Sequence, residues 1–255
     1  MRMVKPLYPD WPAPPRVRAV FTLRMGGASV GAFASLNLGD HVGDDAHAVA
    51  ENRRRAATEL ELPAEPLWLA QVHGTTVVEA DGPALRALAA PAPQGDAALT
   101  RRPGRVLAVL VADCLPVLLA RRDGAAVAVA HAGWRGLSAG VLEATIAALD
   151  GAADDLLAWL GPAIGPAHYE VGEEVRTAFC QRDAQAAAAF AANARGRWQC
   201  DLHRLARQRL AALGLRSIHA DRRCTYALPE SFYSFRRDGV TGRMAALIWL
   251  EGTPP

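Results

Sequence analysis

Three residues of the kinds that bind transition metals stand in separate motifs: His73 in QVHG, Cys114 in ADCLPV and His131 in HAGWRG. Two imidazoles and one thiolate suit a divalent transition metal, above all zinc, and copper has a high intrinsic affinity for the same donors. They fill three positions of a tetrahedron and leave the fourth open to water or substrate, whereas a closed structural zinc site takes four protein ligands. The three motifs therefore predict a metal centre that could also be an active site.

Short apolar runs of the kind that forms buried strands precede each of these ligands. They are residues 67–70 before His73, residues 106–111 before Cys114 and residues 125–130 before His131. Strand ends in α/β layers are places where a rigid scaffold holds functional side chains, so we expect the three ligands to meet. The alternative for each one alone is ordinary: a buried thiol for the cysteine and a local hydrogen bond for each histidine.

Two polar neighbours are expected to assist the ligands. Asp113 directly precedes Cys114 and could orient a ligand imidazole or accept a proton, and it could equally cap a turn. A metal-bound histidine usually donates its second ring N–H to a carboxylate or carbonyl, which predicts an acid behind the ligands. Gln71 stands two residues before His73, where it could bind substrate or water.

Four further side chains are candidates for contact with an anion or a sugar: Arg24, Asn37, Arg53 and Arg135. Arg24 precedes glycines that permit tight turns with backbone N–H groups directed at an anion. Arg135 lies at the start of a predicted helix, a favourable place for negative charge. The alternative for each arginine is a solvated side chain or a weak surface ion pair.

Helical periodicity fills the gaps between the apolar runs. Apolar residues repeat at helical spacing over residues 137–149 and 202–213, and the Ala-rich tract 186–192 also predicts helix. Residues 244–250 predict a closing strand, and the stretch 83–94 resembles a linker. The pattern as a whole indicates an α/β fold.

Composition excludes several classes of protein. The chain of 255 residues is 51% hydrophobic, which excludes a disordered protein and fits one large domain. Its net charge of +2 gives no reason to expect nucleic acid or a membrane as partner. The four cysteines form no CxxC pair and the start lacks the apolar core of a signal peptide, so we expect a reduced, cytoplasmic protein. We also expect a monomer.

Long motifs carry a resemblance to a known family. QVHG, ADCLPVLL, HAGWRG, GPAIGP followed by YEVG, and FYSFRRDGVTGR are similar to motifs of the YfiH family, as is the opening TLRMGGASVGAFASLNLGDHVGDD. Its members are also called laccase-domain proteins, multicopper polyphenol oxidoreductases and peptidoglycan editing factors. The resemblance covers about residues 21–250. It implies a layered α/β/β/α sandwich, with residues 1–255 forming a single domain.

The laccase label can be tested by counting ligands. A multicopper laccase needs one His2Cys copper and a three-copper cluster rich in histidine. The chain has only seven histidines and no H-x-H pair, which is too few for four coppers. Laccase chemistry of the usual kind is therefore not expected.

The family resemblance also implies purine nucleoside chemistry: phosphorolysis of adenosine, inosine and methylthioadenosine, with adenosine deamination as a side activity. Purine nucleoside and phosphate would be the partners. His73, Cys114, His131 and Asp113 are the catalytic candidates. Two alternatives stay open, a peptidoglycan-precursor editing hydrolase and a non-catalytic metal- or nucleotide-binding protein whose ligands only hold the fold.

Overall fold

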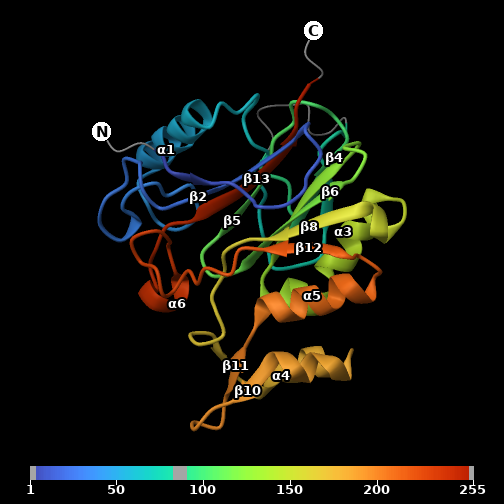
Figure 1. The fold of residues 1–255 in the computed structure, drawn as a ribbon. Coiled ribbons are helices and arrows are strands. Elements are labelled where there is room, and N and C mark those ends of the chain that lie inside the picture. The colour runs from blue at the N-terminus through green and yellow to red at the C-terminus, as the bar shows by residue number, and fades with distance from the viewer. Residues whose placement is uncertain (1–3, 83–90, 253–255) are drawn as a thin grey trace.

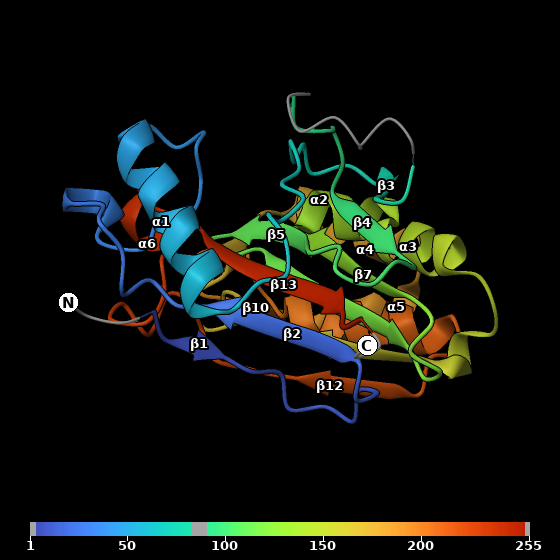
Figure 2. The same ribbon diagram turned by 90° about the horizontal axis from the view of Figure 1, so that it is seen from above.

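Two β-sheets stacked face to face form the centre of the molecule, and helices cover both outer faces (Figures 1 and 2). The structure is a computed structural model that describes residues 4–82 and 91–252. The first sheet is antiparallel and has the order β1-β2-β13-β5. Its strands are β1 (Pro6–Leu7), β2 (Val17–Thr22), β13 (Met244–Leu250) and β5 (Leu107–Val111).

The second sheet is mixed and has the order β12-β8-β6-β7-β4-β3. Its strands are β12 (Ser217–Ala220), β8 (Leu156–Leu160), β6 (Leu115–Arg121), β7 (Val127–Ala132), β4 (Ala97–Thr100) and β3 (Val77–Glu79). The outer pairs β12–β8 and β3–β4 are parallel, and the three inner pairs are antiparallel. β5 and β6 follow one another in the chain but belong to different sheets, so the residues between them cross from one sheet to the other.

Helices form the outer layers. α1 (Ala46–Glu59) packs on the first sheet, whereas α3 (Val141–Leu149) and α5 (Leu202–Ala212) pack on the second. The remaining helices are α2 (Trp134–Ala139), α4 (Glu173–Cys180), α6 (Phe235–Asp238) and the 3-10 turns Gly31–Phe33, Ala153–Asp155 and Ala184–Ala189. A small sheet lies beside α4 at the lower end of Figure 1, in the order β10-β11-β9. Its strands are β10 (Phe190–Ala192), β11 (Trp198–Cys200) and β9 (Glu170–Val171).

Alternation along the central strands explains the layers. In β5, Val109 faces the core between the two sheets, while its neighbours Ala108 and Leu110 face the core under α1. In β6, Leu118 faces the core between the sheets, while Leu119 packs toward α3 and α5. Strands buried on both faces have continuous apolar sequences, as these do. The three cores confirm the layered α/β/β/α sandwich.

Several predicted elements differ from the structure. Residues 67–70 form only isolated bridges, Leu67 with Leu107 and Ala70 with Gln94, because the backbone pairs with different segments at its two ends. The helix predicted for residues 186–192 is wrong: a 3-10 turn ends at Ala189 and β10 follows, since Asp201 N–H pairs with the Ala189 carbonyl and β11 pairs with β10.

Other predicted elements are confirmed, some of them with changed bounds. The helix over residues 137–149 is divided into α2 and α3 at Gly140, whose φ of 111° is left-handed. The helix over 202–213 and the strand over 244–250 are confirmed by α5 and β13. Of the linker-like stretch 83–94, residues 83–90 lie outside the described residues.

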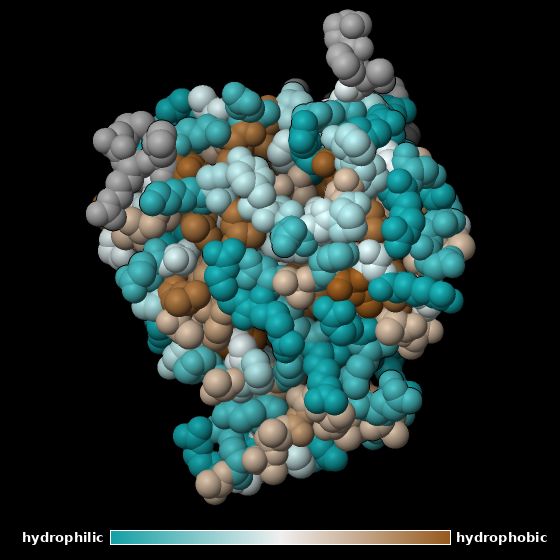
Figure 3. Space-filling view, viewed as in Figure 1, coloured by the Kyte–Doolittle hydropathy of each residue, from teal (hydrophilic) through white to brown (hydrophobic). Residues whose placement is uncertain are grey.

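The surface mixes hydrophilic and hydrophobic residues. The face in Figure 3 carries many hydrophilic side chains with separated hydrophobic patches between them. Among the described residues, no helix has both the length and the apolar character that a bilayer crossing requires.

Candidate metal centre

His73, Cys114 and His131 meet at one point. Their potential ligand atoms all lie within 4.8 Å of one another, and Cys114 Sγ is 3.8 Å from His73 Nε2. The two imidazole rings lie 4.8 Å apart at an angle of 75°. Cys114 lies at the crossover between β5 and β6, His131 lies inside β7, and His73 lies in a loop. Cys114 stands between the end of β5 and the start of β6, and His131 is next to last in β7, so both lie at strand ends as expected, whereas the residues before His73 form only isolated bridges.

One buried carboxylate, that of Asp96, orients two of the three ligands. Its Oδ1 lies 2.8 Å from His131 Nδ1, which leaves His131 Nε2 as the metal-facing atom. The same carboxylate accepts backbone N–H bonds from Val72, His73 and Gly74 at 3.1, 2.9 and 2.7 Å. These bonds hold His73 in a left-handed conformation with φ of 60°, which a residue with a side chain adopts only when its surroundings fix it.

Gly133 leaves the space between the ligands free. A Cβ atom at this position would lie 2.9 Å from Cys114 Sγ and 2.9 Å from His73 Cδ2. Both distances are shorter than van der Waals contact, so any side chain here would push against two of the ligands. Gly133 is also the N-cap of α2, which packs so closely that a Cβ on Gly136 would lie 2.8 Å from the Gly74 carbonyl.

Cys114 and His131 form a charged pair in the metal-free protein. Burial by itself would raise the pKa of the Cys114 thiol, but the adjacent His131 imidazolium overcomes this effect and lowers it to about 6. Burial likewise disfavours the charged form of His131, while the thiolate and the Asp96 carboxylate raise its pKa to about 9. A thiolate is the form of cysteine that binds a metal, so this environment favours the ligand state.

A cavity of about 520 Å³ opens beside the three ligands. Three arginines contribute to its wall, namely Arg135, Arg236 and Arg243, together with the aromatic residues Trp134, Tyr169 and Phe235. The guanidinium of Arg135 stacks on the Trp134 ring at 4.6 Å, and that of Arg236 on the Tyr169 ring at 5.1 Å. Cationic and aromatic groups on one wall suit a ligand that has both a planar ring and an anion.

Gln71 and Asp113 also line this cavity, but both side chains have structural partners. Gln71 exchanges two hydrogen bonds with the backbone of Leu110: its Nε2 donates to the carbonyl at 2.9 Å and its Oε1 accepts from the N–H at 2.7 Å. The Asp113 carboxylate accepts from Thr225, Ser234 and Arg236. The acid that orients a ligand imidazole is therefore Asp96, in the place where Asp113 was expected.

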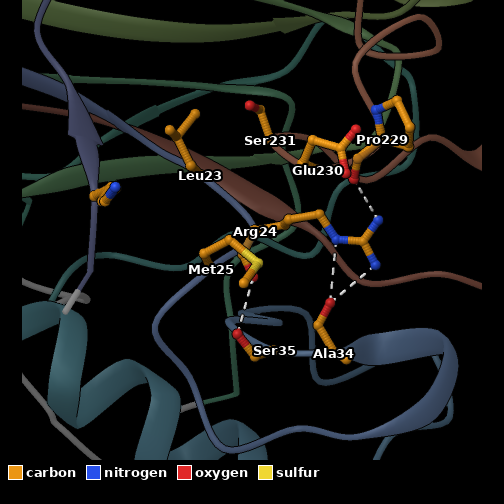
Figure 4. A pocket seen from close by; sticks show the side chains of 9 residues that line it. Leu23, Arg24, Met25, Ala34, Ser35, Pro229, Glu230 and Ser231 are labelled. Carbon is orange, nitrogen blue, oxygen red and sulfur yellow. Dashed lines mark hydrogen bonds between the residues drawn. The ribbon is translucent and has the colours of Figure 1, made fainter. Parts of the chain in front are cut away.

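Arg24 lies in a different cavity, of about 620 Å³ (Figure 4). Its guanidinium donates to the Ala34 carbonyl at 2.9 and 3.1 Å and to the Pro229 carbonyl at 2.7 Å, and it stacks on the Tyr233 ring. Within residues 4–82 and 91–252, the residues lining this cavity and those lining the metal cavity do not overlap. Arg24 therefore connects the opening motif, through Ala34, with the C-terminal part of the chain, through Pro229 and Tyr233.

Asn37 and Arg53 do not line the metal cavity. Asn37 is buried, and its Oδ1 accepts from the backbone N–H groups of Gly39 and Arg243 at 2.9 and 2.8 Å. Arg53 donates to the Leu38 carbonyl at 3.0 Å, pairs with Asp40 and stacks on Trp68. Of the four side chains expected to contact an anion or sugar, only Arg135 lines the metal cavity.

Sequence reasoning missed Asp96, Tyr169 and Arg243. Asp96 precedes β4 in QGDAALT, where an acid is an ordinary turn residue, and only the pairing of β4 with β7 brings it beside His131. Tyr169 lies in the YEVG motif and Arg243 in the FYSFRRDGVTGR motif. These two motifs are the sequence features that could have identified them as residues of the site.

Comparison with known proteins gives a consistent family. The family described as multi-copper polyphenol oxidoreductase laccase matches residues 18–251. A protein of Pseudomonas aeruginosa named purine nucleoside phosphorylase is 54% identical over 96% of this chain and 98% of its own. The purine nucleoside phosphorylase YfiH of Escherichia coli is 49% identical over 97% of this chain and 100% of its own.

Solved structures agree with these relatives. A Neisseria meningitidis protein superposes with a TM-score of 0.91 at 46% identity, covering 97% of this chain and 99% of its own. A YfiH protein of Bacillus licheniformis gives a TM-score of 0.87 at 31% identity, covering 92% and 93%. The match of sequence, fold and named relatives over nearly the whole length shows that the chain belongs to the YfiH family of laccase-type proteins.

Proposed function

We propose that this protein is a zinc-dependent purine nucleoside phosphorylase that acts on adenosine, inosine and S-methyl-5′-thioadenosine. The observation that carries the proposal is a three-ligand His2Cys group that opens onto a cavity lined by three arginines. The names of the curated relatives support the same activity. A volume of about 520 Å³ falls within the usual range of small-molecule sites, roughly 300–1,000 Å³.

The donor set fits zinc. Two imidazoles and one thiolate are typical zinc ligands, and the open fourth position is typical of catalytic rather than structural sites. His73, Cys114 and His131 would hold the ion, and the lack of a side chain at Gly133 leaves these ligands unobstructed. When bound, the ion supplies positive charge that can stabilise negative charge developing on a substrate. Copper suits the same donors, but this single group of three ligands, found among the described residues, does not provide for four coppers.

The reaction requires an anion site beside a ring site. A phosphate oxygen forms a bond to the ribose C1′ while the bond from C1′ to the purine nitrogen breaks, and the electron pair leaves with the purine, which takes up a proton. In this proposal Arg135, Arg236 and Arg243 bind the phosphate and direct it at C1′. Trp134, Tyr169 and Phe235 pack against the purine and ribose and exclude water. These roles rest on the shared cavity wall.

Adenosine deamination is a second reaction that the same centre supports. Water adds through its oxygen to C6 of the purine, the bond from C6 to the amino nitrogen breaks, and ammonia leaves. The observation that favours it is that the three ligands line a cavity, because catalytic zinc sites keep a fourth position for water. This reaction needs no phosphate, which separates it from phosphorolysis.

The test is chromatographic. Purified zinc-loaded protein is incubated with adenosine, with and without phosphate, beside the Cys114→Ala variant. We expect phosphate-dependent adenine and ribose 1-phosphate, lost by more than about 100-fold in the variant. Inosine formed without phosphate would identify the deaminase activity. If a folded, zinc-loaded sample forms neither product, the nucleoside proposal fails and a UDP-linked muramyl precursor becomes the next substrate to test.

The same variant separates catalysis from a purely structural metal. If the ligands only hold the fold, Cys114→Ala lowers the melting temperature sharply. If they form an active site, turnover is lost while unfolding changes little. Thermal melts of both proteins, with zinc and with chelator, give this comparison.

A further inference from the structure

Asp113 is buried beside the metal ligands, yet its carboxylate is bound to a distant part of the chain. Oδ1 accepts from the Thr225 hydroxyl at 2.6 Å, while Oδ2 accepts from the Ser234 hydroxyl at 3.0 Å and from the Arg236 backbone N–H at 2.7 Å. All three donors come from the segment that contains α6. Three donors therefore occupy both oxygens of the carboxylate and fix its orientation.

The same contacts determine where Arg236 lies. Its backbone N–H is fixed by Asp113, and its side-chain Nη1 donates to the Glu170 carbonyl at 2.6 Å. The guanidinium also stacks on the Tyr169 ring at 5.1 Å. Arg236 is exposed, and the Asp113 carboxylate is the buried group that binds its backbone N–H.

We propose that Asp113 is a positioning residue: through its bond to the Arg236 backbone it holds that guanidinium in the wall where phosphate binds. The inference rests on the proposed function, because it assigns Arg236 to the phosphate. Asp113 then affects the binding of phosphate rather than proton transfer, and its effect passes through Arg236.

Backbone geometry guides the choice of substitutions. Asp113 has a φ of 87°, a left-handed conformation that glycine and asparagine tolerate better than alanine does. Asp113→Gly therefore removes the carboxylate without adding backbone strain. Asp113→Asn keeps the shape: its amide oxygen can accept from Ser234 and Arg236 while its NH2 group donates to the Thr225 hydroxyl.

The experiment compares these variants in zinc-loaded protein. For Asp113→Gly we expect the KM for phosphate to rise about 10-fold, with kcat at saturating phosphate and zinc content little changed. For Asp113→Asn we expect values within about 3-fold of the wild type. A large fall of kcat in both Asp113→Gly and Asp113→Asn would overturn the proposal, because it would show that the negative carboxylate itself takes part in the reaction.

A double variant tests whether the effect passes through Arg236. If it does, Asp113→Gly combined with Arg236→Ala has the same KM for phosphate as Arg236→Ala alone. Independent, multiplying effects would overturn the proposal. Should Asp113→Gly fail to fold, Thr225→Val removes one of the three donors at nearly constant volume, and we expect a KM rise of about 2-fold that Arg236→Ala again abolishes.

Hydrogen exchange separates this inference from the proposed function. The Arg236 amide should exchange slowly in the wild type and at least about 10-fold faster in Asp113→Gly, whether or not the protein cleaves nucleosides. If the Arg236 amide is protected but no phosphorolysis occurs, the bond between Asp113 and the Arg236 backbone is confirmed. The role of Arg236 in binding phosphate then fails together with the proposed function. If exchange is equally fast in both proteins, the proposed role of the Asp113 bond is wrong.

Discussion

The metal-binding wall of the cavity differs from the arginine-lined wall in how its residues are held. His73 is exposed, but the His131 and Asp96 side chains are 4% and 0% exposed, and the Asp96 carboxylate fixes both His131 and the loop that carries His73. Arg135 and Arg236 are exposed. Each of the three arginines is held by a different neighbour: Arg135 stacks on Trp134, the Arg236 backbone binds Asp113 and the Arg243 backbone binds Asn37. Among the contacts of the described residues, no single group holds all three.

This difference indicates that the two walls affect different quantities, metal affinity on one side and substrate affinity on the other. A buried group that orients several ligands at once is expected to affect metal affinity and turnover together, and its loss should be large. Exposed arginines that are held separately should each change substrate affinity by a smaller factor and leave the metal in place. Substitutions on the two walls should therefore differ both in size and in the quantity that changes.

The largest effect on the metal wall should come from Gly133→Ala. The added methyl group would lie 2.9 Å from Cys114 Sγ and from His73 Cδ2, and the two ligands cannot both retreat without leaving the metal. We expect zinc affinity and turnover to fall by more than about 100-fold. Metal content after dialysis against a zinc buffer measures the first, and adenine release the second.

Gly252→Ala is the matched control, because no atom lies within 4 Å of the position that its Cβ would take. It should keep wild-type zinc content. Full zinc occupancy in Gly133→Ala would show that the ligands can move and still bind the metal. It would contradict the expected difference between the metal-binding wall and the arginine-lined wall.

Asp96→Asn should have the next largest effect. The amide keeps the shape of the carboxylate, but it removes the charge that supports His131 and places an NH2 group near donors. Loss of such a supporting group typically lowers metal affinity by about 10–100-fold. Competition with a coloured chelator measures this loss. An affinity within 2-fold of wild type would contradict the role given to Asp96.

Alkylation of metal-free protein gives an independent view of the same substitution. In the wild type the Cys114 thiol has a pKa of about 6, so alkylation should reach half of its plateau near that pH. Asp96 raises the pKa of His131. Without that carboxylate His131 carries less positive charge, the thiolate is less stabilised, and the midpoint should move to higher pH. A midpoint that moves to lower pH would contradict this electrostatic account.

The sequence predicted the metal wall because ligand chemistry restricts which residues can serve. Histidine and cysteine are uncommon in this chain, and three of them stand in distinctive motifs. Asp96 could not be found in the same way: acids are common in turns, and its role depends on strand pairing that brings it beside His131. The layers followed from alternation and apolar runs, whereas the irregular loop before His73 did not.

The arginine wall was harder to predict because arginine is ordinary on a surface. Only tertiary packing separates Arg135, which lines the cavity, from Arg24, whose guanidinium binds two backbone carbonyls elsewhere. Asn37 has an indirect place in the site, since its Oδ1 accepts from the backbone of Arg243. Spacing along the chain contains no information about such contacts.

Arg135→Ala should change the arginine wall without disturbing its support. The side chain is exposed and stacks on Trp134, so truncation removes one cation from the cavity and little packing. We expect the KM for phosphate to rise about 10-fold, equivalent to about 1.4 kcal/mol, with zinc content unchanged. Arg204→Ala, an exposed arginine of α5 outside this cavity, should leave both values unchanged. A fall in zinc content in Arg135→Ala would show that the two walls are coupled.

Gln71→Leu should have the smallest effect on activity, although Gln71 lies in the cavity. Both ends of its amide are bound to the backbone of Leu110 in β5, so the leucine variant leaves a buried N–H and a buried carbonyl without these partners. We expect the free energy of unfolding to fall by about 1–3 kcal/mol, while kcat/KM stays within about 3-fold. Gln71→Glu is the matched variant, because it keeps the acceptor for the Leu110 N–H and loses only the donor. Its free energy of unfolding should lie between those of the wild type and Gln71→Leu. Urea unfolding and phosphorolysis rates on the same samples measure both quantities. A large loss of kcat/KM in a stable Gln71→Leu protein would instead place this amide among the groups that bind the substrate.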